Sequence, residues 1–554
     1  MKKLLILFIT LTSCIYVCAQ EQQKKQLKLI TTDYTVHNEA EIPGAIILTG
    51  NVQFEHDGAN IFGNKVYFFQ KDQYIKVFGD VRLIQGDSVT IVGNYGEYNG
   101  KDNLAFITDK VNLRSKESTL ATDTLFYNRN TQQAYYNNNG TINSGQNTLK
   151  SKNGTYDVNS KKFIFRTNVD VKSPSATITT NHLDYYENSG HAYVFGPSWI
   201  IQSNGDKLYT ENGFYDTKND IANIGKNPII YSQDKTIQAG KIFYDKKTNY
   251  VRAENNIKIT DTINNMVATG HFAEVFRDKD SMYLTKKALI KTLIEKDTMY
   301  LHGKQIVTTG PENNKVARAY NNVRIYKSDL SGKCDSIYSN QKLGITKMIN
   351  NPVLWSQGSQ ITGDVIYLLS DNQTEKMDSI KVLNNAFIIQ KDTLGVGYNQ
   401  MKGIDLFGKF KDNKLNIIDL VRNTESVYYM YNDDNELVGI EKAICSKIRL
   451  EIEDNEIQNV IRYINPESEI YPEADLPPNA RLLKGFKWRG DEEIKSLDDI
   501  FPLDELTEDE IANKIKIATD LKEQQPMEVL QETLDQNNPE LNSIKDLKNQ
   551  KGKK

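Results

Sequence analysis

Apolar and polar residues alternate along most of this 554-residue chain. The stretch 74–83 shows the pattern, with apolar residues at Ile75, Val77, Val81 and Leu83. A period of two residues places neighbouring side chains on opposite faces of a strand, so that one face is buried and the other meets water. Helix-like periodicity begins only after about residue 500. The pattern therefore predicts an all-β protein with a short helical or disordered tail.

A repeat of 29 or 30 residues is superimposed on this alternation. Its marker is an aromatic residue followed by polar turn residues, found at Phe69, Tyr98, Tyr127, Tyr156, Tyr186, Tyr215 and Tyr244, with a looser copy at Phe276. Asn, Asp, Gly and Lys after each aromatic favour tight hairpin turns. A single unit cannot bury its apolar face, whereas stacked units can. The repeat predicts an elongated antiparallel array, of jellyroll or solenoid-like form, with an apolar interior.

Changes in the repeat divide the chain into regions. Residues 27–310 form the predicted β-jellyroll repeat domain, and 311–400 continue as β-strands in a looser register. A shorter repeat then indicates a second, C-terminal β-module over 401–490. Its turn dipeptides are Asp412-Asn413, Asp434-Asn435 and Asp454-Asn455. Residues 491–554 form an acidic tail, in which Leu506–Leu521 has helix-compatible composition. We expect this tail to be solvated and partly disordered, with a partner-binding helix as the alternative.

The first residues have the features of a secretory signal peptide, predicted over 1–19. Two lysines precede the apolar segment 4–17, and small residues precede a cleavage site after Ala19. Two alternatives remain open: a lipobox-like sequence that would leave a lipid on Cys14, and an uncleaved membrane anchor. No later apolar run reaches the length of a membrane helix. The mature protein is therefore expected to be exported, and soluble or peripherally attached to a membrane.

Composition and motifs exclude several function classes. The net charge is −4, and the chain lacks the dense Lys/Arg stripe of a nucleic-acid binder. The mature chain keeps only Cys334 and Cys445, too few for a disulfide framework or a zinc site. The six histidines form no catalytic or metal-binding motif, and acidic residues lack calcium-loop spacing. We therefore predict no catalytic residue, no metal, no cofactor and no enzymatic activity.

The strand motifs resemble those of a known family. Gly50-Asn51-Val52-Gln53-Phe54 and Gly79-Asp80-Val81-Arg82-Leu83 alternate with strand–turn units such as Asn64–Phe68 and Asn94–Tyr98. This pattern resembles the OstA-like (organic solvent tolerance) family of periplasmic lipopolysaccharide-transport jellyroll proteins. The resemblance covers about residues 27–390, and the chain's size resembles the long versions found in Bacteroidota-type bacteria. The extra C-terminal module has no clear counterpart in that family.

The resemblance implies a β-jellyroll, open along one side, that shelters the acyl chains of lipopolysaccharide. It also implies end-to-end strand pairing with other jellyroll proteins in a periplasmic bridge toward the outer membrane. The candidate lipid-binding residues are Val52, Phe54, Ile75, Val77, Val81, Leu83, Val111, Leu113, Phe163, Phe165, Val169 and Val171. The competing interpretation of these residues is ordinary dry core between two sheets.

Two further alternatives concern aromatic residues and strand direction. We expect the recurring tyrosines to cover a sheet edge or rim, with carbohydrate stacking as the alternative. For the whole protein, the alternative is an exported parallel β-solenoid that serves as an adhesin or a polysaccharide-binding scaffold. Outward-facing aromatic residues would favour that alternative. Tight turns such as Asn130-Thr131 and Asn159-Ser160 instead favour antiparallel hairpins.

Overall fold

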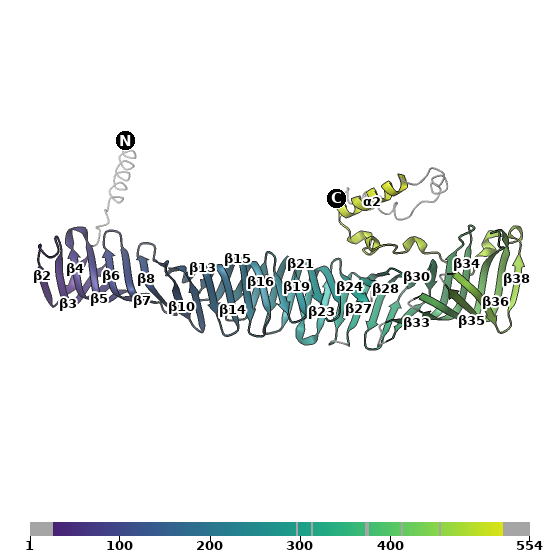
Figure 1. Ribbon diagram of the computed structural model, residues 1–554, viewed down its shortest axis with the longest axis horizontal. Coiled ribbons are helices and arrows are strands. Elements are labelled where there is room, and N and C mark those ends of the chain that lie inside the picture. Colours follow the sequence, from purple (N-terminus) through teal and green to yellow (C-terminus); the bar gives the residue numbers. More distant parts are fainter. Residues whose placement is uncertain are drawn as a thin grey trace, which may run out of the picture. The chain divides into compact units, whose positions relative to one another are not determined.

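The structure is a computed structural model that describes residues 26–294, 297–311, 314–371, 376–411, 414–453 and 456–523. These residues form two compact units, divided between Lys226 and Asn227. Figure 1 draws and labels their strands. Both consist of antiparallel strands, which confirms the predicted all-β antiparallel fold and disagrees with a parallel solenoid. The predicted signal peptide, the tail beyond 523 and the turn dipeptides at 412–413 and 454–455 lie outside the described residues.

Unit 1 contains seventeen strands and one short 3₁₀ turn among its described residues. They are β1 Lys28–Thr31, β2 Tyr34–His37, β3 Ile46–His56, β4 Ala59–Phe69, η1 Gln70–Asp72, β5 Tyr74–Gln85, β6 Val89–Asn99, β7 Leu104–Arg114, β8 Ser118–Asn128, β9 Gln133–Tyr136, β10 Gly140–Ser144, β11 Asn147–Ser151, β12 Asn153–Asp157, β13 Lys162–Lys172, β14 Ala176–Tyr186, β15 His191–Gln202, β16 Lys207–Asp216 and β17 Ile221–Gly225. From β3 to β8, each strand pairs antiparallel with the next. The predicted turns at 130–131 and 159–160 lie in hairpin connections, β8–β9 and β12–β13.

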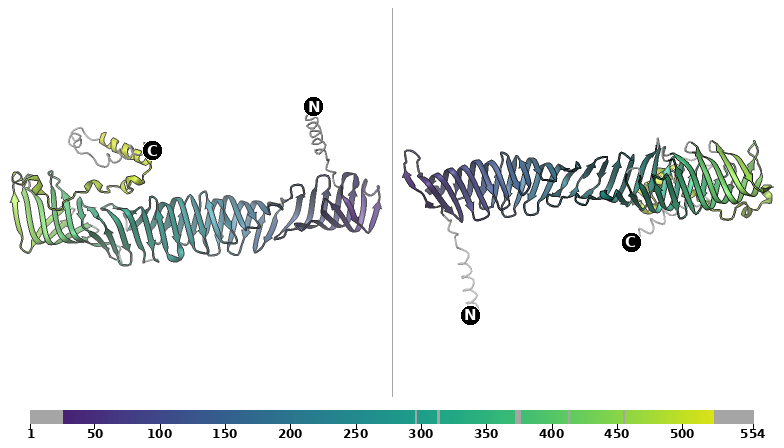
Figure 2. Two further views of the ribbon diagram at one scale, coloured as in Figure 1. Left: turned by 180° about the vertical axis from the view of Figure 1, so that it is seen from behind. Right: turned by 90° about the horizontal axis from the view of Figure 1, so that it is seen from below.

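The long strands of unit 1 bend at one repeated place. In β3, β5, β7 and β13 the bend falls on two successive residues with positive φ: Gly50-Asn51, Gly79-Asp80, Asp109-Lys110 and Thr167-Asn168. The pairing register shifts at each bend, because extra residues on the bent strand form a β-bulge. Each bent strand therefore runs from one layer into the facing layer (Figure 2). One 29-residue repeat supplies one such strand and the antiparallel strand that pairs with it, and the result is a jellyroll.

Asparagine and aspartate side chains link neighbouring bends. Asn64 Nδ2 donates to Asp80 Oδ2 at 2.9 Å, and Asn94 Nδ2 donates to Asp109 Oδ2 at the same distance. These residue types also tolerate the left-handed backbone better than other residues with side chains. The same polar residues thus shape the bend and tie adjacent repeats together.

Unit 2 continues the antiparallel pattern with longer strands toward its end. Its strands are β18 Ile229–Ser232, β19 Lys235–Gln238, β20 Lys241–Asp245, β21 Tyr250–Asp261, β22 Met266–Phe276, β23 Ser281–Thr285, β24 Leu289–Ile294, β25 Asp297–His302, β26 Gln305–Thr309, β27 Val316–Lys327, β28 Leu330–Asn340, β29 Ile345–Ile349, β30 Val353–Ser356, β31 Ser359–Thr362, β32 Val365–Ser370, β33 Met377–Lys391, β34 Tyr398–Lys411, β35 Lys414–Tyr431, β36 Leu437–Glu453, β37 Glu456–Tyr463 and β38 Glu467–Tyr471. Its helical elements are η2 Arg277–Lys279, η3 Glu473–Asp475, η4 Pro478–Arg481, η5 Gly490–Glu492, η6 Leu497–Asp499, η7 Leu503–Glu505 and α2 Glu508–Glu523. The region boundaries expected at 310/311 and 400/401 mark no break, because β26 pairs with β27 and β34 spans the second position.

The chain after β38 turns back over the outer face of unit 2, and we call residues 473–506 the strap. Gln360 and Gln400 point outward from β31 and β34 and are fully buried beneath it. Each exchanges two side-chain hydrogen bonds with the strap backbone, at 2.6–2.9 Å. Leu476 and Leu483 of the strap pack into an apolar cluster with side chains of β33, β35 and β36. The strap is therefore an ordered part of unit 2.

Opposite charges hold the acidic part of the strap. Lys333 Nζ lies 2.9 Å from Glu492 Oε2, and Lys304 Nζ lies 2.6 Å from Asp504 Oδ2. The prediction of a solvated tail is therefore wrong for 491–506, because tertiary ion pairs bind this segment. The predicted helix is present as α2. No helix among the described residues is long and apolar enough to cross a membrane.

Candidate functional site

Apolar side chains inside unit 1 line up in register from strand to strand. We call this row the apolar ladder, and its members are Phe54, Ile61, Leu83, Ile91, Leu113, Leu120, Ile142, Leu149, Val171, Ile178, Ile200 and Leu208. None is more than 3 % exposed. At the usual strand spacing of about 4.8 Å, eleven steps make a row of roughly 50 Å. The interior of unit 1 is therefore continuously apolar along one layer.

The twelve predicted lipid-binding residues all face this interior. They lie on β3, β5, β7 and β13, and each is at most 2 % exposed. Residues before and after a bend, such as Val77 and Val81, belong to the two facing layers. The structure thus brings all twelve onto inner faces, where they pack as core. Their contact with a lipid stays a prediction.

The recurring tyrosines form a second inward row, on the other layer. Its members alternate mainly between large and small residues: Tyr98, Ala105, Tyr127, Ala134, Tyr156, Phe163, Tyr185, Ala192, Tyr215 and Ala222. None is more than 4 % exposed. The expectation that these rings cover a rim is wrong, because they lie in the core. Burial also removes the carbohydrate-stacking alternative for these residues.

The sequence pattern marks two copies of the repeat one residue too late. Tyr185, not Tyr186, occupies the inward row, and Phe68, not Phe69, is the buried residue of its pair. Both pairs consist of two adjacent aromatic residues. Since neighbouring residues of a strand point to opposite faces, only one of each pair can enter the core, and the spacing alone did not select it.

Polar side chains bridge the side of unit 1 where the hairpin turns of the two layers meet, and we call this line of contacts the seam. The Tyr127 hydroxyl donates to Gln85 Oε1 at 2.9 Å, and Gln85 Nε2 donates to Gln132 Oε1 at 2.8 Å. Further cross-layer pairs are Ser115–Glu187 (2.9 Å), Asn147–Thr217 (3.0 Å) and Ser175–Asp220. The side expected to be open is therefore bridged by side chains, because turn residues of both layers reach one another.

Arg129 makes four hydrogen bonds at the seam. Its Nη1 donates to the His56 carbonyl oxygen at 3.0 Å and to the Tyr98 hydroxyl oxygen at 2.8 Å. Its Nη2 donates to the Asp57 carbonyl oxygen at 2.8 Å, and its Nε donates to Gln85 Oε1 at 3.2 Å. The guanidinium thus joins the β8–β9 turn of one layer to two turns of the other.

Burial keeps the tyrosine hydroxyls at the seam in their neutral form. It raises the pKa of Tyr127 to about 12, and burial likewise raises the pKa of Tyr156 above its usual range. These hydroxyls are therefore hydrogen-bond donors at neutral pH. The hydrogen bonds of these tyrosines are therefore unaffected by titration of their hydroxyls near neutral pH.

The fold and interior define a class: an antiparallel jellyroll with a continuous apolar interior closed by a polar seam. Residues 24–181 match the model of a family described as OstA-like protein. The match confirms, for this part of unit 1, the resemblance predicted from the Gly-Asn-Val and Gly-Asp-Val strands. The family is non-enzymatic, in agreement with the prediction that the chain is not an enzyme.

Comparison with curated proteins gives no match. Among solved structures, the chain is similar to the crystal structure of LptH, the LptA-homologous periplasmic component of the conserved lipopolysaccharide transport device from Pseudomonas aeruginosa. The identity is 16 % and the TM-score is 0.21, over 26 % of this chain and 99 % of that chain.

Proposed function

We propose that this protein resides in the periplasm, binds lipopolysaccharide in the interior of unit 1 and passes it toward the outer membrane. The observation that carries the proposal is the apolar ladder, most of which lies within the OstA-like segment 24–181. An acyl chain gains about 0.8 kcal/mol for each CH₂ removed from water. A continuous apolar row offers such a chain the same environment at every strand.

The seam is the proposed route by which acyl chains enter. On the opposite side the layers are joined through the bent strands themselves, whose opening would break backbone pairing. At the seam, side-chain hydrogen bonds connect the layers. Each contributes on the order of 1 kcal/mol between neutral groups and roughly 1.5–3 kcal/mol where a charged group takes part. Lateral opening there exposes the ladder while the sugar part of the lipid stays in water.

End-to-end assembly with other jellyroll proteins is supported by the first strands of unit 1. The short strands β1 and β2 pair with β3 and leave outer edges. Tyr34 and Val36 of β2 are 71 % and 51 % exposed. Exposed strand edges are templates for the addition of another strand. We propose that a neighbouring jellyroll protein pairs at this edge.

Site-specific photocrosslinking in cells tests the lipid proposal. A benzophenone amino acid replaces Phe54, Val81 or Phe165 in the interior, and in matched controls it replaces the outward neighbours Gln53 or Arg82. Lipopolysaccharide adducts at the interior positions and none at the controls are expected. A folded, exported protein without interior adducts would overturn the proposal.

A reversible bridge across the seam tests the route. Gln85→Cys and Gln132→Cys, joined by a reducible bis-thiol linker, should abolish the Phe54 adduct with purified lipopolysaccharide, and reduction should restore it. The native Cys334 and Cys445 are buried, and burial raises the pKa of Cys334 to about 12, so they should resist the linker. Undiminished adducts in the bridged protein would exclude entry at the seam.

A further inference from the structure

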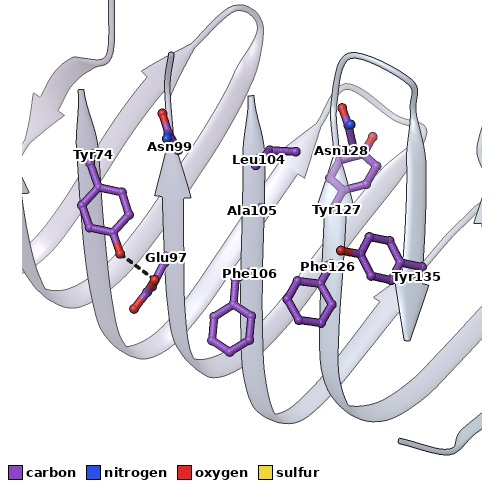
Figure 3. Close-up of a pocket in the computed structure, with 10 residues that line it drawn as sticks. All are labelled: Tyr74, Glu97, Asn99, Leu104, Ala105, Phe106, Phe126, Tyr127, Asn128 and Tyr135. Carbon is purple, nitrogen blue, oxygen red and sulfur yellow. Dashed lines mark hydrogen bonds between the residues drawn. The ribbon is translucent and has the colours of Figure 1, made fainter. Parts of the chain in front are cut away.

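The outer face of unit 1 carries a patch of aromatic rings beside a pocket. Phe106, Phe126 and Tyr135 are direct cross-strand neighbours on β7, β8 and β9. Their ring centroids are 5.2 and 4.9 Å apart along the row. Figure 3 shows the three rings beside one another on this face. The planes of Phe106 and Phe126 are inclined by 50°, and those of Phe126 and Tyr135 by 11°. Tyr135 is 45 % exposed. These rings are unlike the buried tyrosines of the repeat, because solvent reaches them.

Polar groups that accept and donate hydrogen bonds border the rings. The pocket has a volume of about 240 Å³ and is also lined by Tyr74, Glu97, Asn99 and Asn128 (Figure 3). The hydroxyls of Tyr74 and Tyr95 donate to the Glu97 carboxylate, each at 2.5 Å. Burial alone would raise the pKa of Glu97, but these hydrogen bonds and Lys76 outweigh it and hold that pKa below its usual range. The pocket therefore contains an ionised acceptor at neutral pH.

The chemistry of the pocket selects one class of ligand. None of its ten lining residues is Lys, Arg or His, and Lys76, whose Nζ lies 3.8 Å from Glu97 Oε1, is already paired with that carboxylate. A phosphate or other anion would therefore find no cation among the lining residues. The same charge disfavours a purely apolar ligand, whose burial would desolvate the carboxylate. A neutral sugar fits both the aromatic rings and the polar groups of the pocket. Its C–H face packs on an aromatic ring, while its hydroxyls donate to a carboxylate and exchange hydrogen bonds with amides.

A second outward aromatic group lies farther along the same layer. Tyr193 and Phe214 are cross-strand neighbours on β15 and β16, with ring centroids 5.3 Å apart. The register leads from Tyr135 through Thr155, Ile164 and Asp184 to Tyr193. Four strand steps separate the groups by about 19 Å. Two separate groups of aromatic rings on one face favour a sugar chain, which can contact both, over a single small molecule.

We propose that the outer face of unit 1 binds neutral carbohydrate chains through Phe106, Phe126 and Tyr135, with Glu97 as the hydrogen-bond acceptor. The inference does not depend on lipid binding, since these residues face away from the apolar ladder. The chain could be the sugar part of a lipid or a free polysaccharide, and the ring-and-carboxylate chemistry is the same for both.

Affinity measurements with the full mature protein test this inference. The probes are a neutral hexasaccharide of β-linked glucose and the lipid-free polysaccharide released from lipopolysaccharide. The variant Phe106→Leu/Phe126→Leu/Tyr135→Leu removes the rings but keeps apolar side chains on the sheet. The matched control, Trp199→Leu/Tyr209→Leu, removes an exposed aromatic pair from the other layer. Circular dichroism verifies that both variants fold.

Binding of at least one probe by the native protein and the control, and at least about tenfold weaker binding by the triple variant, is expected. Glu97→Gln should weaken binding without changing the fold. The probe that binds identifies the source of the sugar. Failure of both probes, equal affinity of the triple variant, or protein rather than glycan adducts from a crosslinker at Tyr135 would overturn the inference. Lipid binding is measured independently, by photocrosslinking at Phe54 in the interior. A negative result in the sugar-binding assay would therefore leave the lipid proposal unaffected.

Discussion

Arg129 provides the sharpest test of the seam. Its buried guanidinium makes four hydrogen bonds, and three of them cross to turns of the other layer, at the His56 and Asp57 carbonyls and the Gln85 side chain. The substitution Arg129→Ala removes all four and leaves two backbone carbonyls without this donor. If the seam joins the layers, local opening of the β3–β4 and β8–β9 turns should become easier.

The expected magnitude follows from opposing contributions. Hydrogen bonds from a charged donor contribute roughly 1.5–3 kcal/mol each. Against this stands the cost of burying a guanidinium, which is several kcal/mol. We therefore expect Arg129→Ala to lower the free energy of local opening by about 2–3 kcal/mol. At about 1.4 kcal/mol per factor of ten, amide exchange in these turns should accelerate by roughly 30- to 150-fold.

Hydrogen exchange read by mass spectrometry measures this locally, without assuming that both units unfold together. Peptides that cover 54–60 and 127–134 should accelerate, whereas the β12–β13 turn at 158–161 should not. The control Arg166→Ala removes a half-exposed arginine with weaker contacts and should change exchange by about twofold at most. Unchanged exchange in both seam peptides, or equal acceleration at 158–161, would refute the cross-layer role of Arg129.

Three further predictions concern packing and pH. Phe54→Ala should lower the free energy of unfolding by about 3–5 kcal/mol, and Phe54→Leu by less than about 1.5 kcal/mol. The melting temperatures of the two variants compare these losses, and equal losses would contradict tight packing of the ladder. Gly140→Ala places a Cβ 2.3 Å from the Tyr136 ring, so it should destabilise unit 1, and Tyr136→Leu should relieve the defect in the double variant. The Arg489 and Lys333 side chains lower the pKa of Glu492 to about 2. The Glu492 carboxylate therefore stabilises the strap fully above its unfolded pKa of about 4.3, and this stabilisation is lost as pH falls toward 2. Pepsin cleavage of the strap should therefore rise in that window after correction for enzyme activity, and Glu492→Gln should remove the dependence.

Much of unit 1 was predictable because its pattern is local. Alternation with period two identifies inward residues directly, so Phe54, Val81 and Phe165 all lie in the core as expected. The repeat also predicted antiparallel hairpins, because short polar turns connect neighbouring strands. These features depend on residues that are adjacent in sequence or one repeat apart.

The bends were harder to predict, because each depends on two successive positions with positive φ, and different residue types can occupy those positions. Gly50-Asn51 reads as a turn, but Thr167-Asn168 occupies the same position with positive φ and contains no glycine. The two pairs share only their place in the 29-residue repeat, directly before an inward valine, Val52 or Val169. The bend of a strand into a second layer is therefore visible in the repeat but not in any single copy.

The strap could not be read from the sequence. Its acidic composition is typical of a solvated segment, and its partners lie far away along the chain. Gln360 and Gln400 bind its backbone rather than its side chains, so no side-chain pattern in 473–506 reports the contact. Lys304 and Lys333 become a basic surface only after the strands of unit 2 assemble.

A seam that is closed without lipid is energetically compatible with a lipid-binding interior. Opening one repeat breaks a few side-chain hydrogen bonds. They contribute on the order of 1 kcal/mol each between neutral groups and roughly 1.5–3 kcal/mol each where Arg129 or a carboxylate takes part. One acyl chain with about thirteen buried CH₂ groups gains roughly 10 kcal/mol. Side chains of the ladder exchange contacts with one another for contacts with the acyl chain, so the ladder itself loses little. If lipid binds as proposed, this gain is large enough to open a few neighbouring repeats, and the seam would close again over each repeat that the lipid leaves.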